Sequence, residues 1–203
     1  MKTKHTQNIR RMVSMAILIA IVIILQAAIA IPLGPFTITL TLVPIIIGAI
    51  IYGPVAGAIL GGIFGIVVCI QVVTGAAGLY SFMMFEYSPV LTLAICIIKG
   101  AAAGLVSGLI YKLLAAKQHN KLGVILSAIA CPIVNTAIFA IALLAFYGNL
   151  TTTWAMENSY ASVFTFIIMF MIGLNFVVEF AINVLLIPAV LTIIKAVKRQ
   201  ISR

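Results

Sequence analysis

The chain has 203 residues, of which 65% are hydrophobic and 7% are charged, and its formal net charge at pH 7 is +9. Soluble domains carry about 25% charged residues, so this composition excludes a water-soluble globular protein and predicts an integral membrane protein. The basic excess does not indicate nucleic-acid binding, because these residues gather at the ends of apolar segments.

Long apolar segments recur along the chain, and a helix needs about 20 such residues to cross the hydrocarbon core of a bilayer. Breaks rich in glycine, proline or polar residues separate six segments, which we expect to be transmembrane helices. Their approximate bounds are 12–31, 39–52, 55–74, 89–115, 122–147 and 161–194. The segments are continuously apolar rather than alternating, which disfavours a transmembrane barrel. The sequence therefore predicts an all-α membrane protein with one transmembrane domain, residues 1–203.

The first segment has some features of a cleaved signal peptide. A basic stretch, MKTKHTQNIRR, precedes it, and the AIA sequence at 28–30 resembles a cleavage site. Its apolar part, residues 12–31, is long enough to span a bilayer, so we interpret it as a retained helix. Ala16 and Ala20 lie four apart near its basic end. Small residues with this spacing form a smooth strip that can receive a partner helix.

The basic residues predict the orientation of the helices. All but one of the 12 Lys and Arg residues precede the first segment, surround the turn between the fourth and fifth, or follow the sixth. If six helices alternate, these positions share one side, which the positive-inside rule assigns to the cytoplasm. The opposite connections, 32–38, 75–88 and 148–160, contain no Lys or Arg. Both termini are therefore expected in the cytoplasm.

Several polar side chains interrupt the apolar segments. Lys99 and Glu179 are ionisable, and a charge at membrane depth is costly and marks a functional candidate. Asn175, Glu179 and Asn183 are spaced by four and share one helical face. With Asn135 on the fifth segment, they are expected to form a polar ligand site inside the bundle. The alternative is that Lys99 and Glu179 form an internal ion pair and that the asparagines bond neighbouring helices.

The connections on the expected outer side carry aromatic and polar residues. Aromatic side chains at this depth are typical of an interfacial belt, while glycine-flanked aromatic connections above a polar site resemble a lid. We include six of these residues among the candidate substrate contacts: Phe36, Thr37, Tyr80, Phe85, Glu86 and Trp154.

No catalytic or nucleotide-binding motif is present. There is no HExxH sequence and no glycine-rich phosphate loop with a lysine. The three cysteines have no metal-ligand spacing. The sequence therefore predicts a protein that is not an enzyme and has neither a metal site nor an ATP site. Two double GxxxG patterns, at 57–65 and 100–108, are expected to pack helices within the bundle.

Residues 31–67, IPLGPFTITLTLVPIIIGAIIYGPVAGAILGGIFGIV, carry the most specific family signal. They resemble the P-x-G-P and VP-x-x-x-G-x-x-x-x-GP-x-x-G pattern of S-components, the substrate-binding membrane subunits of energy-coupling-factor (ECF) vitamin transporters. The resemblance is greatest to the pantothenate, riboflavin and folate branch. The size, the six segments and the orientation also match, so the resemblance covers the whole chain.

This resemblance implies a mechanism and a set of partners. An S-component of a bacterial cell membrane binds a vitamin from outside, docks on a coupling protein with two ATPases, and topples to release the vitamin inside. The ATPases use ATP, and no cofactor is implied in this chain. Ala16 and Ala20 match the docking strip of the family. The resemblance places ligand contacts on the fourth to sixth helices and on the first and third outer connections. Lys99, Asn135, Asn175 and Glu179 fall in these regions.

Pantothenate is the best match for the substrate, with riboflavin, folate or another vitamin precursor as alternatives. A second class of protein is a stand-alone ion-coupled secondary transporter that uses Lys99 and Glu179 as a coupling pair. The lack of a clear inverted repeat disfavours it. A third class, an intramembrane enzyme, is disfavoured by the missing catalytic cluster.

Overall fold

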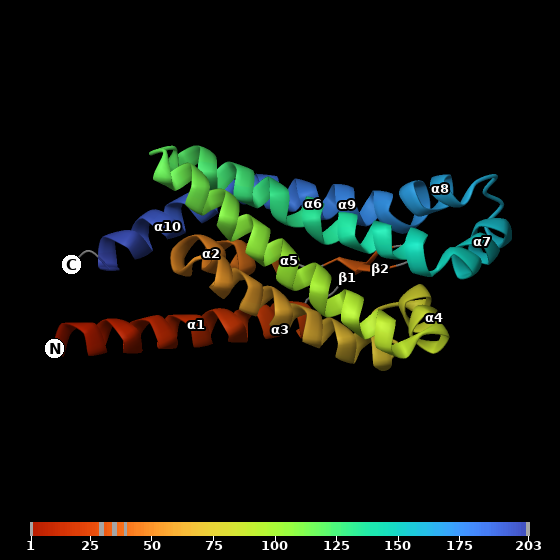
Figure 1. Cartoon of the computed structure of the whole chain (residues 1–203), viewed down its shortest axis with the longest axis horizontal. Helices are drawn as coiled ribbons and strands as arrows, with labels where there is room; N and C mark the ends of the chain where they lie inside the picture. Colours follow the sequence, from red (N-terminus) through yellow and green to blue (C-terminus); the bar gives the residue numbers. More distant parts are fainter. Residues whose placement is uncertain (1, 29–30, 34–35, 39, 202–203) are drawn as a thin grey trace.

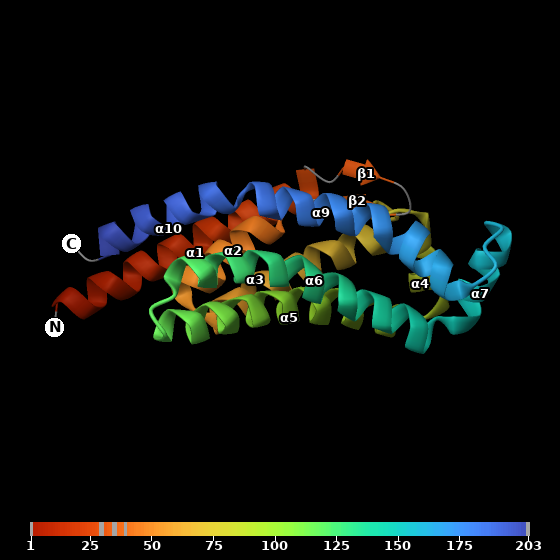
Figure 2. The same ribbon diagram turned by 90° about the horizontal axis from the view of Figure 1, so that it is seen from above.

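The computed structural model describes residues 2–28, 31–33, 36–38 and 40–201. Its helices form an elongated bundle, with a small antiparallel hairpin of two strands at one side (Figures 1 and 2). In chain order the elements are α1 (Lys2–Ala28), β1 (Ile31–Leu33), β2 (Phe36–Ile38), α2 (Leu42–Tyr52), α3 (Pro54–Val73), α4 (Leu79–Tyr87), α5 (Pro89–Ala116), α6 (Asn120–Phe146), α7 (Gly148–Glu157), α8 (Val163–Thr165), the π-helix η1 (Phe166–Gly173), α9 (Leu174–Leu185) and α10 (Ile187–Ile201).

By length and composition, the described residues contain fewer candidate spanning helices than the six expected. Within the described residues, 4 helices (α1, α3, α5 and α6) are long and apolar enough to cross a membrane, or up to 5 candidates if α9 and α10 count as one bent span. The remaining candidate, α2, has 11 residues. At 1.5 Å per residue it covers about 16 Å, roughly half of the hydrocarbon core. The expected class, a helical membrane protein, is confirmed. The length and composition of the described helices do not by themselves identify six complete spans.

The expected sixth helix, 161–194, is divided. It contains α8, the π-helix η1, α9 and the start of α10, and the axes of α9 and α10 differ by 48°. Pro188 is the second residue of α10. Proline has no N–H and its ring clashes with the preceding turn, so it is best accommodated in the first turn of a helix and elsewhere kinks or breaks it. A new helix therefore begins at Ile187.

Two outer connections that we expected as loops contain helices. Residues 75–88 include α4, which begins after Gly78 at a φ of 97° and ends before Pro89. Glycine reaches this positive φ without strain. Residues 148–160 include α7, which follows α6 with a break at Tyr147. Both short helices lie at the end of the bundle opposite the two termini (Figure 1).

The glycine patterns on α3 and α5 bring the two helix backbones into direct contact. A methyl group added at Gly61 would collide with the carbonyl oxygen of Gly100, and one at Gly104 would collide with that of Gly57. A Cβ at Gly65 would lie 2.5 Å from the Cys96 carbonyl oxygen. The expectation that these glycines pack the bundle is confirmed, because only glycine permits this approach.

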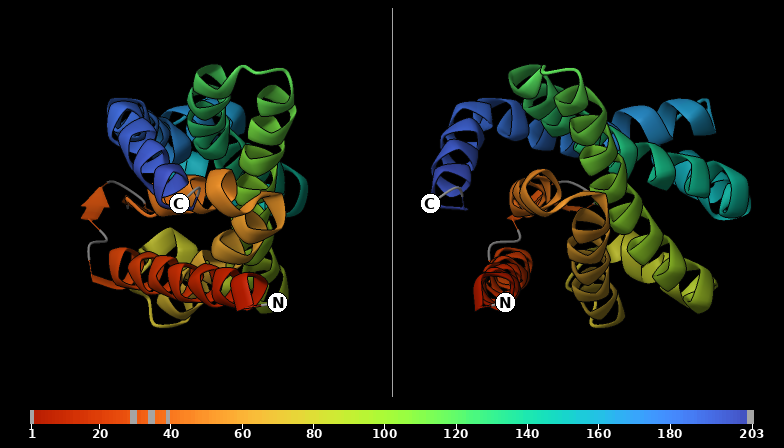
Figure 3. Two further views of the ribbon diagram at one scale, coloured as in Figure 1. Left: turned by 90° about the vertical axis from the view of Figure 1, so that its left-hand side faces the viewer. Right: turned by 60° about the vertical axis from the view of Figure 1, so that its left-hand side comes forward.

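Helix α1 lies at the edge of the bundle, as the end-on view on the left of Figure 3 shows. Only 11% of the residues in its most apolar stretch are buried inside the bundle. Near its N-terminal end, Arg11 donates a hydrogen bond of 3.0 Å to the Tyr52 carbonyl oxygen at the end of α2. The turn between α5 and α6 and both ends of the chain lie at the same end of the long axis (Figure 1).

Candidate functional site

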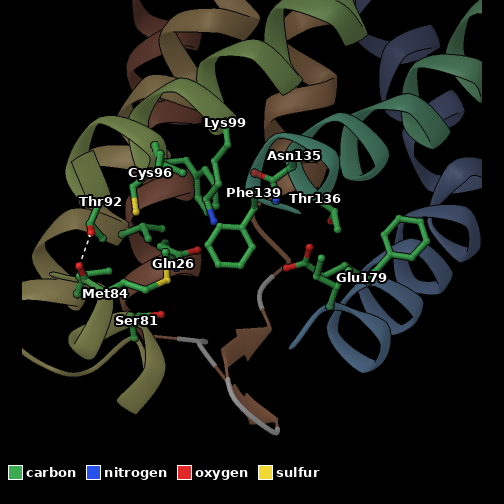
Figure 4. Close-up of a pocket in the computed structure, with 17 residues that line it drawn as sticks. Gln26, Ser81, Met84, Thr92, Cys96, Lys99, Asn135, Thr136, Phe139 and Glu179 are labelled. Atoms are coloured by element: carbon green, nitrogen blue, oxygen red, sulfur yellow. Dashed lines mark hydrogen bonds between the residues drawn. The ribbon is translucent and has the colours of Figure 1, made fainter. Parts of the chain in front are cut away.

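A cavity lies inside the bundle and contains about 840 Å³ of empty space, including the part open to solvent. Its walls come from α1, α3, α4, α5, α6, η1 and α9 (Figure 4). The lining residues are Gln26, Phe64, Val68, Val72, Ala77, Ser81, Met84, Thr92, Ile95, Cys96, Lys99, Asn135, Thr136, Phe139, Ile172, Phe176 and Glu179.

The charged residues of this lining are Lys99 and Glu179. The Lys99 ammonium group lies over the Phe139 ring, with Nζ 4.8 Å from the ring centroid. In the view of Figure 4 this ring lies between the Lys99 side chain and the Glu179 carboxylate. The cavity lining thus carries one basic and one acidic side chain. Such an arrangement can orient a ligand that has distinct charged and neutral ends.

Asn135 supplies a buried hydrogen-bond acceptor. Its side chain is 7% exposed, and its Oδ1 atom has no hydrogen-bond partner among the residues that the structure describes. A buried acceptor without a donor is destabilising by about 1–3 kcal/mol.

Sequence analysis did not identify Gln26 as a site residue. Gln26 is 2% exposed, lines the cavity, and hydrogen-bonds to Thr41 at the start of α2 and to Gln71 on α3. The signal was present, because Gln26 is the single amide side chain in the apolar stretch 12–28. Its partner Gln71 lies 45 residues away in sequence, and sequence spacing alone does not reveal that contact.

The structure brings together three of the predicted site residues, Lys99, Asn135 and Glu179, which all line the cavity. Asn183 is also buried, at 3% exposed, and its Nδ2 donates a hydrogen bond of 2.7 Å to the Glu179 carbonyl oxygen. It is not among the lining residues.

The predicted outer residues are placed differently. Glu86 is exposed on α4, and Phe85 packs beside the small buried cluster that includes Val72 and Cys96. The side chains of Phe36, Thr37 and Asn175 lie outside the described part of the structure.

Trp154 and Tyr80 belong to an aromatic cluster that joins α4, α7 and η1. Their ring centroids are 4.9 Å apart at an interplanar angle of 85°, and the Asn158 amide donates a hydrogen bond of 3.2 Å to the Tyr80 hydroxyl. Trp154 is 1% exposed. The same apolar cluster includes Met84 and Ile172, which also line the cavity. The aromatic residues therefore pack behind the cavity wall rather than contact its space directly.

Ala16 and Ala20 are both exposed on α1, between Arg11 and Gln26. Their neighbours Met12, Val13, Ile17 and Ile24 are exposed as well. This face is apolar, in keeping with a helix that contacts lipid or another membrane helix.

These features, a helical membrane bundle around a polar cavity, agree with the comparison with known families. The chain belongs to the family described as the ECF transporter, substrate-specific component, whose model matches residues 10–191. It is also similar to the pantothenic acid transporter PanT of Lactococcus lactis subsp. cremoris (strain MG1363). The two are 31% identical over 157 residues, which cover 70% of this chain and 76% of the relative. The family predicted from residues 31–67 is confirmed, and the chain is a multi-pass membrane component of a transporter.

Proposed function

We propose that this chain is the pantothenate-binding S-component of an ECF-type importer. The observation that carries the proposal is the Lys99 ammonium group at the wall of an internal cavity. Pantothenate has one carboxylate, one amide and two hydroxyl groups. Lys99 would bind the carboxylate as a charge-assisted hydrogen-bond donor. Asn135 Oδ1 would accept a hydrogen bond from a hydroxyl or the amide N–H.

The name of the similar PanT protein supports pantothenate over other vitamins. The alternatives within the same role are riboflavin, folate or another vitamin precursor. A pocket that uses a lysine for a carboxylate disfavours riboflavin, because riboflavin carries no carboxylate.

We further propose six passages through a bacterial cell membrane, with both termini in the cytoplasm. In this arrangement α2, with its 11 residues, makes the second passage, and the hairpin lies in the outer connection before it. The placement of the two termini and the α5–α6 turn at one end of the bundle supports this orientation (Figure 1). The basic residues near these segments then face the cytoplasm.

The transport cycle proposed here involves partners. The exposed strip at Ala16 and Ala20 would dock on the ECF coupling protein, and two partner ATPases would use ATP. The docked component would topple to release pantothenate inside the cell. The chain itself would need no cofactor and would perform no chemical reaction.

Binding to the purified chain tests this function. The full chain in lipid nanodiscs is titrated with pantothenate, riboflavin and folate by isothermal calorimetry. We expect saturable binding of pantothenate at a stoichiometry of one and no heat change with riboflavin. Tight binding of riboflavin or folate without pantothenate would contradict the substrate. Ion-driven transport by the chain alone in liposomes would support the secondary transporter instead.

A further inference from the structure

We propose that Gln26 is a further substrate-binding residue, whose amide is oriented by Gln71 and Thr41 to direct one N–H into the cavity. The proposal rests on the proposed pantothenate-binding function and adds a contact from α1. The group that it would bind is an uncharged acceptor oxygen, such as an amide carbonyl or a hydroxyl.

One backbone carbonyl determines the orientation of both glutamine amides. The Gln71 Nε2 atom donates a hydrogen bond of 2.8 Å to the Gln26 carbonyl oxygen. A carbonyl oxygen only accepts, so the nitrogen of the Gln71 amide must face it. The Gln71 Oε1 atom is then an acceptor for Gln26, whose Nε2 atom donates to it at 2.7 Å.

The orientation of the Gln26 amide follows from this contact. Its nitrogen faces Gln71, so its Oε1 atom faces the Thr41 hydroxyl, which donates a hydrogen bond of 3.0 Å. A primary amide carries two N–H donors. One of them bonds to Gln71, and the second makes no hydrogen bond to another described residue.

Burial and position leave a ligand as the available partner for this second N–H. Gln26 and Thr41 are 2% and 0% exposed, and Gln71 is 9% exposed, so bulk water does not surround the amides. Of these three residues, Gln26 alone lines the cavity. In the view of Figure 4 it lies on the side of the Phe139 ring away from Glu179. A buried donor is expected to find an acceptor, and the cavity is where one can enter.

Lys99 and Gln26 are donors of different charge, so they are expected to bind different groups of the ligand. The Lys99 ammonium group is charged and favours a carboxylate. The Gln26 N–H is neutral, and it therefore suits an oxygen in the uncharged part of the ligand. A ligand that spans both groups needs a carboxylate at one end and an uncharged acceptor away from it, as pantothenate has.

The test compares pantothenate with pantothenol, in which a hydroxymethyl group replaces the carboxylate. The affinities of the wild type, Gln26→Met, Gln71→Met, Thr41→Val and Lys99→Met are measured for both compounds in nanodiscs. Thermal unfolding without ligand is recorded for every variant. Gln26→Glu provides a second variant of similar size that keeps the acceptor for Thr41 and removes the amide N–H donors.

We expect Gln26→Met to weaken the binding of both compounds by about tenfold, so that the ratio of their affinities stays unchanged. Lys99→Met should reduce that ratio. Gln71→Met and Thr41→Val should weaken binding by about threefold, since they loosen the orientation of an amide that remains present.

Equal losses of ligand affinity in Gln26→Met and Gln71→Met would overturn the inference and leave Gln26 as a structural residue. If Gln26→Met does not fold, wild-type affinity in Gln26→Glu would overturn it as well. A wild type that binds neither compound overturns the proposed function itself. A wild type that binds pantothenate, with unchanged affinity in the Gln26 variants, overturns only this inference.

Discussion

The Lys99 ammonium group and the Phe139 ring form a cation–π contact in the wall of the cavity, with Nζ 4.8 Å from the ring centroid. A contact of this kind contributes about 0.5–2 kcal/mol. A hydrogen-bonded carboxylate stabilises an ammonium group more strongly. The ring therefore orients the lysine side chain and still allows a stronger bond to a ligand carboxylate.

Replacing Lys99 by Ala or Met should weaken pantothenate binding at least tenfold, because the ligand carboxylate loses its cation. Phe139→Leu should weaken binding by a few fold, since Lys99 is then less well oriented. Calorimetric titration in nanodiscs measures both effects. Lys112→Met removes an exposed lysine of the same helix and serves as the control. Unchanged affinity in the Lys99 variants would leave this residue with a structural role.

Asn135→Leu should weaken pantothenate binding without lowering the stability of the ligand-free protein. The substitution removes a buried Oδ1 acceptor that has no partner among the described residues, so the ligand-free protein should unfold at the same or a higher temperature. Pantothenate binding should weaken by about tenfold, because the ligand donor is left without its acceptor. Thermal unfolding with and without pantothenate gives both quantities.

Asn149→Leu makes the same exchange at an exposed position of α7 and is the matched control. A lower unfolding temperature for Asn135→Leu, with pantothenate affinity unchanged, would assign this asparagine to packing between helices.

Ala16→Trp and Ala20→Trp together should abolish transport and leave pantothenate affinity unchanged. Both alanines are exposed on α1, and an indole ring at either position would hold a docking helix away. Uptake of labelled pantothenate in liposomes that contain the coupling protein and ATPases measures transport. Ala137→Trp places the same bulk on the exposed face of α6. Normal uptake by the double variant would contradict the docking strip.

Gly61 and Gly62 are neighbours with opposite expected responses to alanine. A Cβ at Gly61 collides with the Gly100 backbone, while a Cβ at Gly62 meets nothing within 4 Å. Gly61→Ala should therefore lower the thermal unfolding temperature of the free protein. Gly62→Ala should leave it unchanged or raise it, since alanine in a helix is favoured over glycine by about 0.5–1 kcal/mol. Equal effects of the two substitutions would contradict the close packing of α3 and α5.

Part of the candidate site could be predicted from the sequence because its residues differ so clearly from their surroundings. Lys99, Asn135 and Glu179 are polar groups in apolar helices, and lipid cannot satisfy them. Gln26 carries the same signal. Its role depends on its contact with Gln71, and a contact between distant segments follows from the packing of helices rather than from local pattern.

The helix count was less predictable for a physical reason. An apolar composition indicates burial in the membrane, but it does not set how far a segment extends across it. Residues 39–52 are largely apolar, with Thr39 and Thr41 at their start, and the helix within them begins only at Leu42. The 48° bend in the expected sixth helix falls between α9 and α10, where Pro188 lies in the first turn of the new helix. In residues 79–87, apolar and polar side chains do not alternate with the period of a helix. The sequence pattern therefore could not distinguish α4 from a loop.

The glycine contact between α3 and α5 restricts where the protein can change. Backbone touches backbone along this seam, so neither helix can rotate or slide against the other without a clash. The opposite cavity wall, formed by α6, η1 and α9, packs through side chains such as Phe139, Ile172 and Phe176. Substitutions there can reshape the binding space while the seam stays intact. Substitutions in the wall of α6, η1 and α9 can therefore change ligand specificity while the packing of α3 against α5 is preserved.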